Sequence, residues 1–303
     1  MIQVLFMGTP DYAKEILEKL ISEEMIEVVG VYTQPDKPVG RKKILTPPPV
    51  KVLAQKENIP LYQPTRLRDK ETIDEVCSIK CDFIVVAAYG QILPKEILEH
   101  APCINLHASI LPKYRGASPI QQAILEGETQ TGVTAMLMDE GLDTGDIIKI
   151  QTCPIAPDEM VSELYEKLTK IAAELTIDVV KNFSSYTPKP QDDTQATYCK
   201  KITKKDGEII FDDAKKVFNR YRAFTPWPGI FLPSGLKLKE IGFISENGTF
   251  PAGEIIKIEQ DHIVVGCEKG QLKIIRVQSP SKKETDILSY LNGQRLSVGT
   301  ILS

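Results

Sequence analysis

The sequence predicts an α/β domain built around a parallel sheet, followed by a small β-barrel. Up to residue 183, short apolar runs alternate with helical patterns, which is typical of parallel strands joined by helices. After a segment rich in Pro, Ser and Asp at 184–197, short alternating runs separated by turns favour a barrel. The 303 residues are enough for two domains, and 42% hydrophobic and 26% charged residues are ordinary for a globular protein.

The first 33 residues predict the α/β fold class. We expect a buried strand at 2–7, a tight turn at 8–11, a helix at 13–21 and a second strand at 27–33. This strand–turn–helix–strand unit indicates a parallel sheet. The turn holds a single glycine, Gly8, rather than the GxGxxG pattern, so a dinucleotide site has little support.

A segment rich in Pro and Gly at 34–51 interrupts the alternation and excludes regular structure over most of its length. It carries one acidic residue, Asp36, and five basic ones: Lys37, Arg41, Lys42, Lys43 and Lys51. Loops of this length inside a compact unit are usually functional or disordered. The basic cluster would suit phosphates, and the alternative is a solvated insertion.

The remaining elements continue the two patterns. In the first part we expect helices at 50–57, 70–78, 94–99, 121–125 and 162–183, and strands at 83–88, 103–107, 133–138 and 147–150. In the second part we expect strands at 208–211, 229–232, 236–244, 253–258, 262–267 and 271–277. The single tryptophan, Trp227, is expected to pack at the junction of the two domains.

Charge is unevenly distributed along the chain, although the net charge of −4 argues against a general nucleic-acid-binding protein. From residue 200 onward there are 17 basic and 12 acidic residues, a balance of +5. The first 199 residues hold 20 basic and 29 acidic ones, a balance of −9. A basic C-terminal third could lie against a polyanion, and an ordinary solvated surface explains it equally well.

The six cysteines are scattered, and the pair Cys77 and Cys81 has no partner pair at zinc-ligand spacing. They are therefore expected to be reduced and structural. No apolar run approaches the roughly 18 residues of a membrane-spanning helix, and the start MIQVLFMG has no basic leader. These features predict a cytoplasmic location.

Candidate chemistry gathers at the end of the strand expected at 103–107. Asn105 and His107 share one face of that strand, and an amide and an imidazole there could stabilise an oxyanion or move a proton. The loop Ser109–Pro112 offers backbone groups beside them. Asp143, between two glycines, could orient the imidazole, with Asp146 as its competitor.

Each of these features also has a structural explanation. An Asn-x-His pair in a buried strand is more often structural, and an Asp between glycines is often only a turn former. Ser109 lacks the context of a nucleophile elbow, so no nucleophile is evident. Direct transfer between two bound substrates fits these residues better than a covalent enzyme intermediate.

The motifs Asn105-x-His107, SxLPxxxG at 109–116 and GxDTG at 141–145 resemble the formyltransferases that use 10-formyltetrahydrofolate. GTPDYA, TQPDKPVGRKK, AYGQILP, GVTAMLMDEGLDTGDI and FTPWPG narrow the resemblance to the branch that formylates methionyl initiator tRNA. The resemblance covers nearly the whole chain. One departure is Lys113-Tyr114, where relatives often carry Arg-Trp, which keeps charge and aromaticity.

The resemblance implies a Rossmann-like formyltransferase domain at 1–185, a linker at 186–205 and an OB-like C-terminal tRNA-binding barrel at 206–303. It implies that Asn105 and protonated His107 stabilise the oxyanion while Asp143 holds His107. The folate co-substrate would be bound by Ser109, Ile110, Leu111, Pro112, Tyr89, Gly90 and Asp139. The acceptor end of the tRNA would be met by Arg41, Lys42 and Lys43. A monomer without a metal is expected.

Three other functions remain to be weighed. A sister enzyme could formylate an amino sugar nucleotide or hydrolyse formylfolate with the same trio, and the basic insertion and the barrel argue against both. A non-catalytic RNA-binding protein is the third, and the intact set of Asn105, His107 and Asp143 argues against it.

Overall fold

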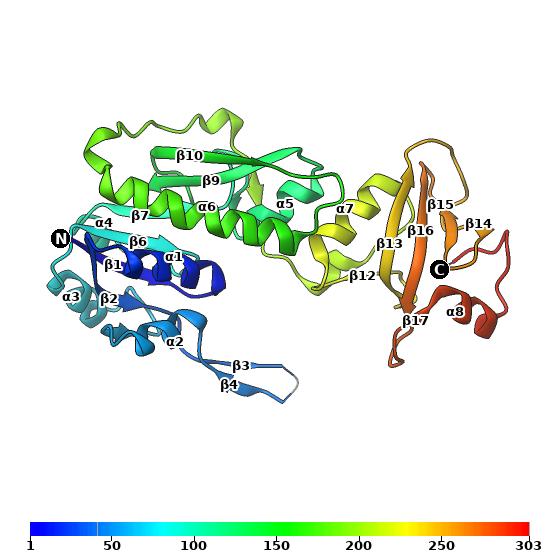
Figure 1. Cartoon of the computed structure of the whole chain (residues 1–303), viewed down its shortest axis with the longest axis horizontal. Coiled ribbons are helices and arrows are strands. Elements are labelled where there is room, and N and C mark those ends of the chain that lie inside the picture. The colour runs from blue at the N-terminus through cyan, green and yellow to red at the C-terminus, as the bar shows by residue number, and fades with distance from the viewer. Residues whose placement is uncertain (41, 303) are drawn as a thin grey trace. The chain divides into compact units, whose positions relative to one another are not determined.

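The computed structural model describes residues 1–40 and 42–302. Two compact units are present, and they do not strictly follow chain order (Figure 1). The first consists of Met1–Pro119, Gln130–Pro154 and Tyr165–Cys199. The second consists of Ile120–Thr129, Ile155–Leu164 and the residues from Lys200 onward.

The first unit is built on a seven-stranded sheet in the order β10-β9-β7-β6-β1-β2-β5. Its strands are β1 (Ile2–Gly8), β2 (Ile26–Tyr32), β5 (Leu61–Tyr62), β6 (Phe83–Ala87), β7 (Cys103–His107), β9 (Gln130–Leu137) and β10 (Ile147–Pro154). Neighbours from β7 to β5 are parallel, whereas β9 runs antiparallel to both β7 and β10. The predicted α/β class is therefore confirmed, with a mostly parallel sheet.

Helices cover both faces of this sheet. Helices α3 (Lys70–Ser78) and α4 (Lys95–Leu98) pack on the face that buries Leu5, Met7 and Ile84. Helices α1 (Asp11–Ser22) and α6 (Val161–Lys181) lie together, since the Tyr12 N–H donates to the Tyr165 hydroxyl oxygen over 2.8 Å. Helix α2 (Pro49–Lys56) packs against α1. Alternate apolar residues of β1 thus have a helix on either side, which is why its central positions are fully buried.

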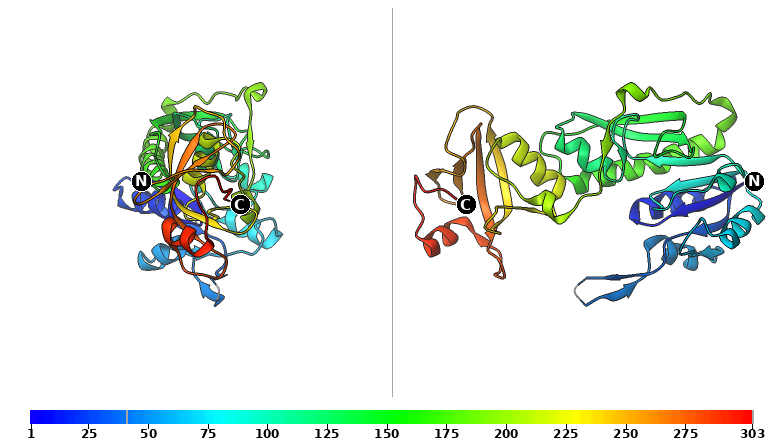
Figure 2. Two further views of the ribbon diagram at one scale, coloured as in Figure 1. Left: turned by 90° about the vertical axis from the view of Figure 1, so that its right-hand side faces the viewer. Right: turned by 180° about the vertical axis from the view of Figure 1, so that it is seen from behind.

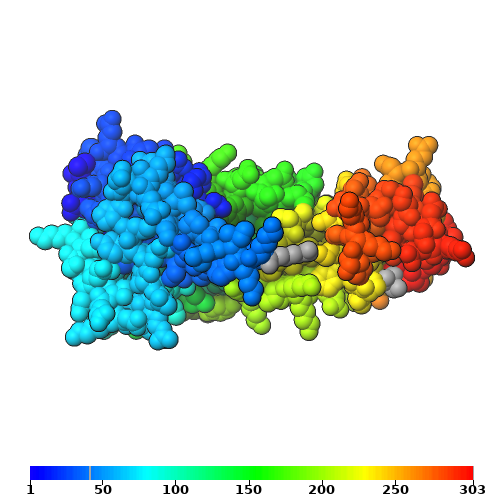
Figure 3. Space-filling model, turned by 90° about the horizontal axis from the view of Figure 1, so that it is seen from below, coloured from blue at the N-terminus to red at the C-terminus, as the bar shows by residue number. Residues whose placement is uncertain are grey.

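The segment at 34–51 differs from the prediction. It forms a hairpin of β3 (Lys37–Val39) and β4 (Ile44–Thr46) that extends from the sheet as an arm (Figures 1 and 2). Both strands are exposed, and Figure 3 shows the arm at the surface of its unit. Strands of three residues with one proline carry too few alternating positions to be predicted from sequence. At its base, the Lys51 ammonium lies 2.8 Å from Asp36 Oδ1.

The second unit contains an antiparallel sheet in the order β12-β13-β16-β15-β14, with β17 beside β16. Its strands are β12 (Ile230–Phe231), β13 (Lys237–Ser245), β14 (Ile255–Ile258), β15 (Ile263–Gly266), β16 (Gln271–Gln278) and β17 (Thr285–Asp286). The predicted small β domain at the C-terminus is confirmed, and its sheet is antiparallel. The strand expected at 208–211 is reduced to a single bridge between Glu208 and Phe231.

Two helices of the second unit were not anticipated. Helix α7 (Ala214–Phe224) packs on β13, and α8 (Ile287–Gln294) packs on β16. Helix α5 (Pro119–Leu125) also belongs largely to this unit. Trp227 is 61% exposed, so most of its side chain is not packed, and its expected place at the junction of the two domains stays a prediction.

Short elements complete the chain: β8 (Arg115–Gly116), β11 (Tyr198–Cys199) and the 3₁₀ turns Phe183–Ser185, Asp193–Gln195 and Lys204–Gly207. Within residues 1–40 and 42–302, each helix is too short or too polar to span a membrane.

Candidate active site

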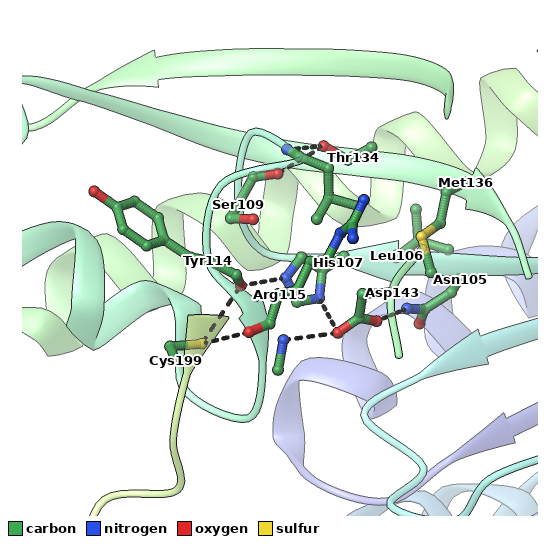
Figure 4. Close-up of polar contacts among 12 residues, drawn as sticks. Asn105, Leu106, His107, Ser109, Tyr114, Arg115, Thr134, Met136, Asp143 and Cys199 are labelled. Carbon is green, nitrogen blue, oxygen red and sulfur yellow. Dashed lines mark hydrogen bonds and ion pairs between the residues drawn. The ribbon is translucent and has the colours of Figure 1, made fainter. Parts of the chain in front are cut away.

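The carboxylate of Asp143 contacts the other two side chains predicted to be catalytic, Asn105 and His107 (Figure 4). Asp143 Oδ1 accepts a hydrogen bond from the Asn105 amide nitrogen over 3.2 Å. Asp143 Oδ2 lies 3.6 Å from His107 Nδ1 and accepts the Gly116 N–H over 2.8 Å. The trio therefore assembles around Asp143, although Asp143 is 38 residues beyond Asn105 in the chain.

The strand and the loop that carry these residues explain why they meet. Asn105 and His107 are alternate residues of β7, so their side chains leave the same face of the sheet. Asp143 lies in the loop between β9 and β10 at φ 54°, a left-handed conformation that Asp tolerates better than most residues. A Cβ at Gly145 would overlap the Leu137 carbonyl oxygen, so only glycine lets the loop fold back this closely.

The hydrogen-bond inventory separates the roles of the trio. His107 Nε2 lies 2.9 Å from the Tyr114 carbonyl oxygen, and a carbonyl only accepts, so Nε2 carries the hydrogen. The other ring nitrogen faces Asp143, so both nitrogens of this buried ring are directed at protein oxygens. The Asn105 amide has two hydrogens and uses one on Asp143. Within residues 1–40 and 42–302, Asn105 is therefore the member of the trio with a hydrogen left for a substrate oxygen.

The loop after β7, which is predicted to bind folate, is held by hydrogen bonds within itself and to Thr134 of β9. The Ser109 hydroxyl donates to the Lys113 carbonyl oxygen over 2.6 Å. Thr134 donates its hydroxyl to the Ser109 carbonyl oxygen and accepts the Leu111 N–H. The side chains of Ser109 and Leu111 are buried, whereas Ile110 and Pro112 are partly exposed. A rigid loop of this kind offers backbone and apolar surface rather than mobile side chains.

The other residues predicted to bind folate lie elsewhere around β7. Tyr89 is buried and Gly90 is exposed just after β6. Asp139 lies beside the amino end of β7, because the Met138 N–H donates to the Cys103 carbonyl oxygen. Asp139 Oδ1 accepts the Gly141 N–H over 3.0 Å and shapes its own loop. Tyr89 and Gly90 thus follow β6, and Asp139 follows β9; these are the two strands that flank β7 in the sheet.

Family models and full-length relatives match this chain. Residues 1–180 match the formyl transferase family, and residues 201–295 match the formyl transferase C-terminal domain. The methionyl-tRNA formyltransferase of Sulfurimonas denitrificans is 62% identical over 302 residues, which is the full length of both chains. That of Wolinella succinogenes is 53% identical over 304 residues, again covering both chains completely.

The chain belongs to the methionyl-tRNA formyltransferase family.

Solved structures with the same fold are more distant in sequence. An N-formyltransferase from Helicobacter canadensis, in complex with folinic acid and dTDP-3-aminofucose, has a TM-score of 0.69 at 19% identity. The match covers 91% of this chain and 99% of that one. HypX from Aquifex aeolicus, in complex with tetrahydrofolic acid, has a TM-score of 0.60 at 17% identity, covering 97% of this chain and 48% of that one. These likenesses concern the fold.

Two of the three residues predicted to contact tRNA lie on the hairpin arm of this formyltransferase. Lys42 and Lys43 are exposed between β3 and β4, and Lys43 has φ 49°. Arg41, the third predicted contact, lies outside the described residues. Across the ranges 1–40 and 42–302, no group of three or more His, Cys, Asp and Glu side chains could hold a metal ion.

Two residues around the site were missed from the sequence. Arg115 is 1% exposed and its guanidinium lies 2.8 Å from Gln191 Oε1, while Gln191 bonds the backbone of the Asp143 loop. Gln191 was assigned to a linker because its neighbours are Pro, Ser and Asp. Cys199 lies in the same segment as Gln191. Burial is the main cause that raises the pKa of its thiol, and the nearby Asp143 carboxylate raises it further. That thiol is therefore poorly suited to act as a nucleophile.

Proposed function

We propose that the chain transfers the formyl group of 10-formyltetrahydrofolate to the amino group of methionine carried by initiator tRNA. The observation that carries this proposal is the single carboxylate of Asp143, which gathers Asn105 and His107 on one face of β7. Full-length relatives that bear the name methionyl-tRNA formyltransferase support the choice of acceptor.

The reaction needs no covalent enzyme intermediate. The methionine nitrogen attacks the formyl carbon, and the carbonyl oxygen becomes an oxyanion. The free amide hydrogen of Asn105 donates to that oxyanion, an interaction worth about 2.7–4 kcal/mol of the barrier for one donor. The bond from the formyl carbon to N10 then breaks, and the proton lost by the amine reaches N10.

His107 and Asp143 hold this geometry and are placed to pass the proton through water. A direct bond from His107 to the oxyanion requires exchange of one of its two present contacts, to Tyr114 or to Asp143. Asp143 thus has two tasks, which are to orient the imidazole and to fix the Asn105 amide.

The folate would extend along β7. Its pterin would reach backbone near Gly90 and the Asp139 loop, and the rest would lie along Ile110 and Pro112. This placement is supported by the positions of Gly90 after β6 and of Asp139 after β9, the two strands that flank β7. Ser109, Leu111 and Tyr89 would contribute through backbone and shape, since their side chains are buried.

The tRNA would meet both parts of the chain. We assign catalysis to residues 1–185, a connection to 186–205 and stem binding to the C-terminal domain at 206–303. Arg41, Lys42 and Lys43 would approach the acceptor end. Binding through phosphates should weaken steeply with salt, with a slope of about −0.7 to −0.9 in log K per log salt for each phosphate neutralised. We further propose a cytoplasmic monomer.

The test is formyl transfer from 10-formyltetrahydrofolate to charged initiator tRNA, with free methionine and an amino sugar nucleotide as competing acceptors. The sugar acceptor is included because solved structures of this fold include sugar formyltransferases. Transfer to the charged tRNA alone is expected. Transfer to the sugar, or release of formate without an acceptor, would overturn the proposal.

A further inference from the structure

We infer that Gln191 is a positioning residue of the active site that holds the Asp143 loop. Arg115 and the rest of the segment, 192–199, keep Gln191 against that loop. This inference deepens the proposed function and rests on it. It assigns an active-site task to a segment whose composition is that of a connector.

Gln191 is bonded to the main chain on both sides of Thr144. Its amide nitrogen donates to the Asp143 carbonyl oxygen over 2.9 Å and to the Gly145 carbonyl oxygen over 2.7 Å. Both hydrogens of the amide are therefore used on the loop that carries the carboxylate. Because Asp143 has a positive φ, its side-chain direction depends on how firmly these peptide groups are held.

Arg115 fixes the orientation of that amide. Its Nε and Nη2 both donate to Gln191 Oε1, over 3.1 and 2.8 Å, and Nη2 also donates to Asp193 Oδ1 over 2.7 Å. A guanidinium has donors only, so the amide oxygen must face it and the amide nitrogen must face the loop. Arg115 is almost wholly buried, and a buried charge of this kind is stable only with such partners.

The same segment also supports the carboxylate end of Asp143. Strand β11 pairs in parallel with β8, with Cys199 opposite Gly116. The Gly116 N–H is the group that donates to Asp143 Oδ2. A Cβ at Gly116 would overlap the Cys199 carbonyl oxygen, so the two strands are in close contact. Asp143 is thus fixed at its backbone by Gln191 and at its carboxylate by Gly116.

This arrangement predicts an effect on rate rather than on substrate binding. Gln191 bonds the loop rather than the reacting atoms, and a displacement of about 1 Å at a catalytic group can cost about 10²-fold in rate. Gln191→Met keeps the length of the side chain but removes both donors and the acceptor. We expect kcat to fall about 10–100-fold, with KM for folate and tRNA unchanged.

The matched control is Gln195→Met, the same substitution four residues further along the same segment. Gln195 is exposed and donates to Asp192 rather than to the catalytic loop, so its replacement should leave kcat unchanged. Arg115→Lys is the second variant, because a lysine keeps the buried charge but cannot supply the same fork of donors. It should lower kcat in the same way while the protein remains folded.

The deciding experiment is a double-mutant cycle of Gln191→Met with Asp143→Asn, measured on the full chain by single-turnover formyl transfer. If Gln191 acts through Asp143, the double variant is no slower than Asp143→Asn alone. Additive losses, or a kcat for Gln191→Met equal to wild type, would overturn the inference. Wild type that does not formylate charged tRNA would instead overturn the proposed function, and the inference with it.

Discussion

Replacing Asn105 by Ala tests the member of the trio that, within residues 1–40 and 42–302, keeps a hydrogen for the substrate. The amide uses one hydrogen on Asp143 over 3.2 Å and keeps the second, whereas both ring nitrogens of His107 already face protein oxygens. Loss of one oxyanion donor costs about 2.7–4 kcal/mol of the barrier, or about 10²–10³-fold in kcat.

The effect on stability should be much smaller. A neutral hydrogen bond contributes about 0.5–1.5 kcal/mol net, and 3.2 Å is at the long end of the normal range. Asn105 is only partly buried, so water can replace the lost contact to Asp143. We therefore expect a loss of about 1 kcal/mol or less in the free energy of unfolding. A large fall in kcat with a nearly unchanged melting temperature is the signature of a catalytic donor.

The assay is single-turnover formyl transfer with saturating folate and charged tRNA. Asn182→Ala is the matched control, because Asn182 makes the same kind of amide–carboxylate bond to Asp178 over 2.9 Å on the surface. It should leave the rate unchanged. Asn105→Asp is the stricter variant, since it keeps the shape but places a second carboxylate beside Asp143. Wild-type turnover in Asn105→Asp, or a loss below about tenfold in Asn105→Ala, would refute the donor assignment.

Three further outcomes follow from the structure. Burial would raise the pKa of Asp213, but hydrogen bonds from the first turn of α7 and from Lys269 hold that pKa below its usual range. The ionised carboxylate therefore stabilises the folded chain, and this stabilisation is lost as pH falls through the folded-state pKa. In urea titrations, Asp213→Asn should be less stable than wild type by about 0.3–1 kcal/mol near neutrality and equal to it in acid. Gly145→Ala should lower kcat and the melting temperature, because the methyl group of the alanine would overlap the Leu137 carbonyl oxygen. The free energy of unfolding should fall by about 1–3 kcal/mol. Burial raises the pKa of Cys103 to about 12, so alkylation at pH 8, followed by mass spectrometry, should be slow in the folded chain and fast in urea.

The parts of the fold that could be predicted are those whose signal lies within a few consecutive residues. The runs of β1 and β6 predict strands because their residues are apolar apart from Gln3 near the start of β1. The strand period of two predicts that Asn105 and His107 share a face. Helix α7 was missed for a physical reason. Two of its buried residues are polar and contact each other, since Arg222 donates to the Asn219 side-chain oxygen over 2.6 Å. That pair interrupts the apolar stripe by which a helix is recognised.

The support of the active site leaves no such local signal. Gln191 acts through hydrogen bonds to backbone carbonyls, which any sequence supplies, and its partner Arg115 is 76 residues away. Pro, Ser and Asp around it indicate a connector, because composition reports only that the segment cannot bury an apolar face. A segment without an apolar face can still be fixed in place when it pairs its backbone with a neighbouring strand, as β11 does with β8. The residues proposed to perform the chemistry could therefore be identified from motif and period, whereas the residues that hold them in place depend on which distant segments the fold brings into contact.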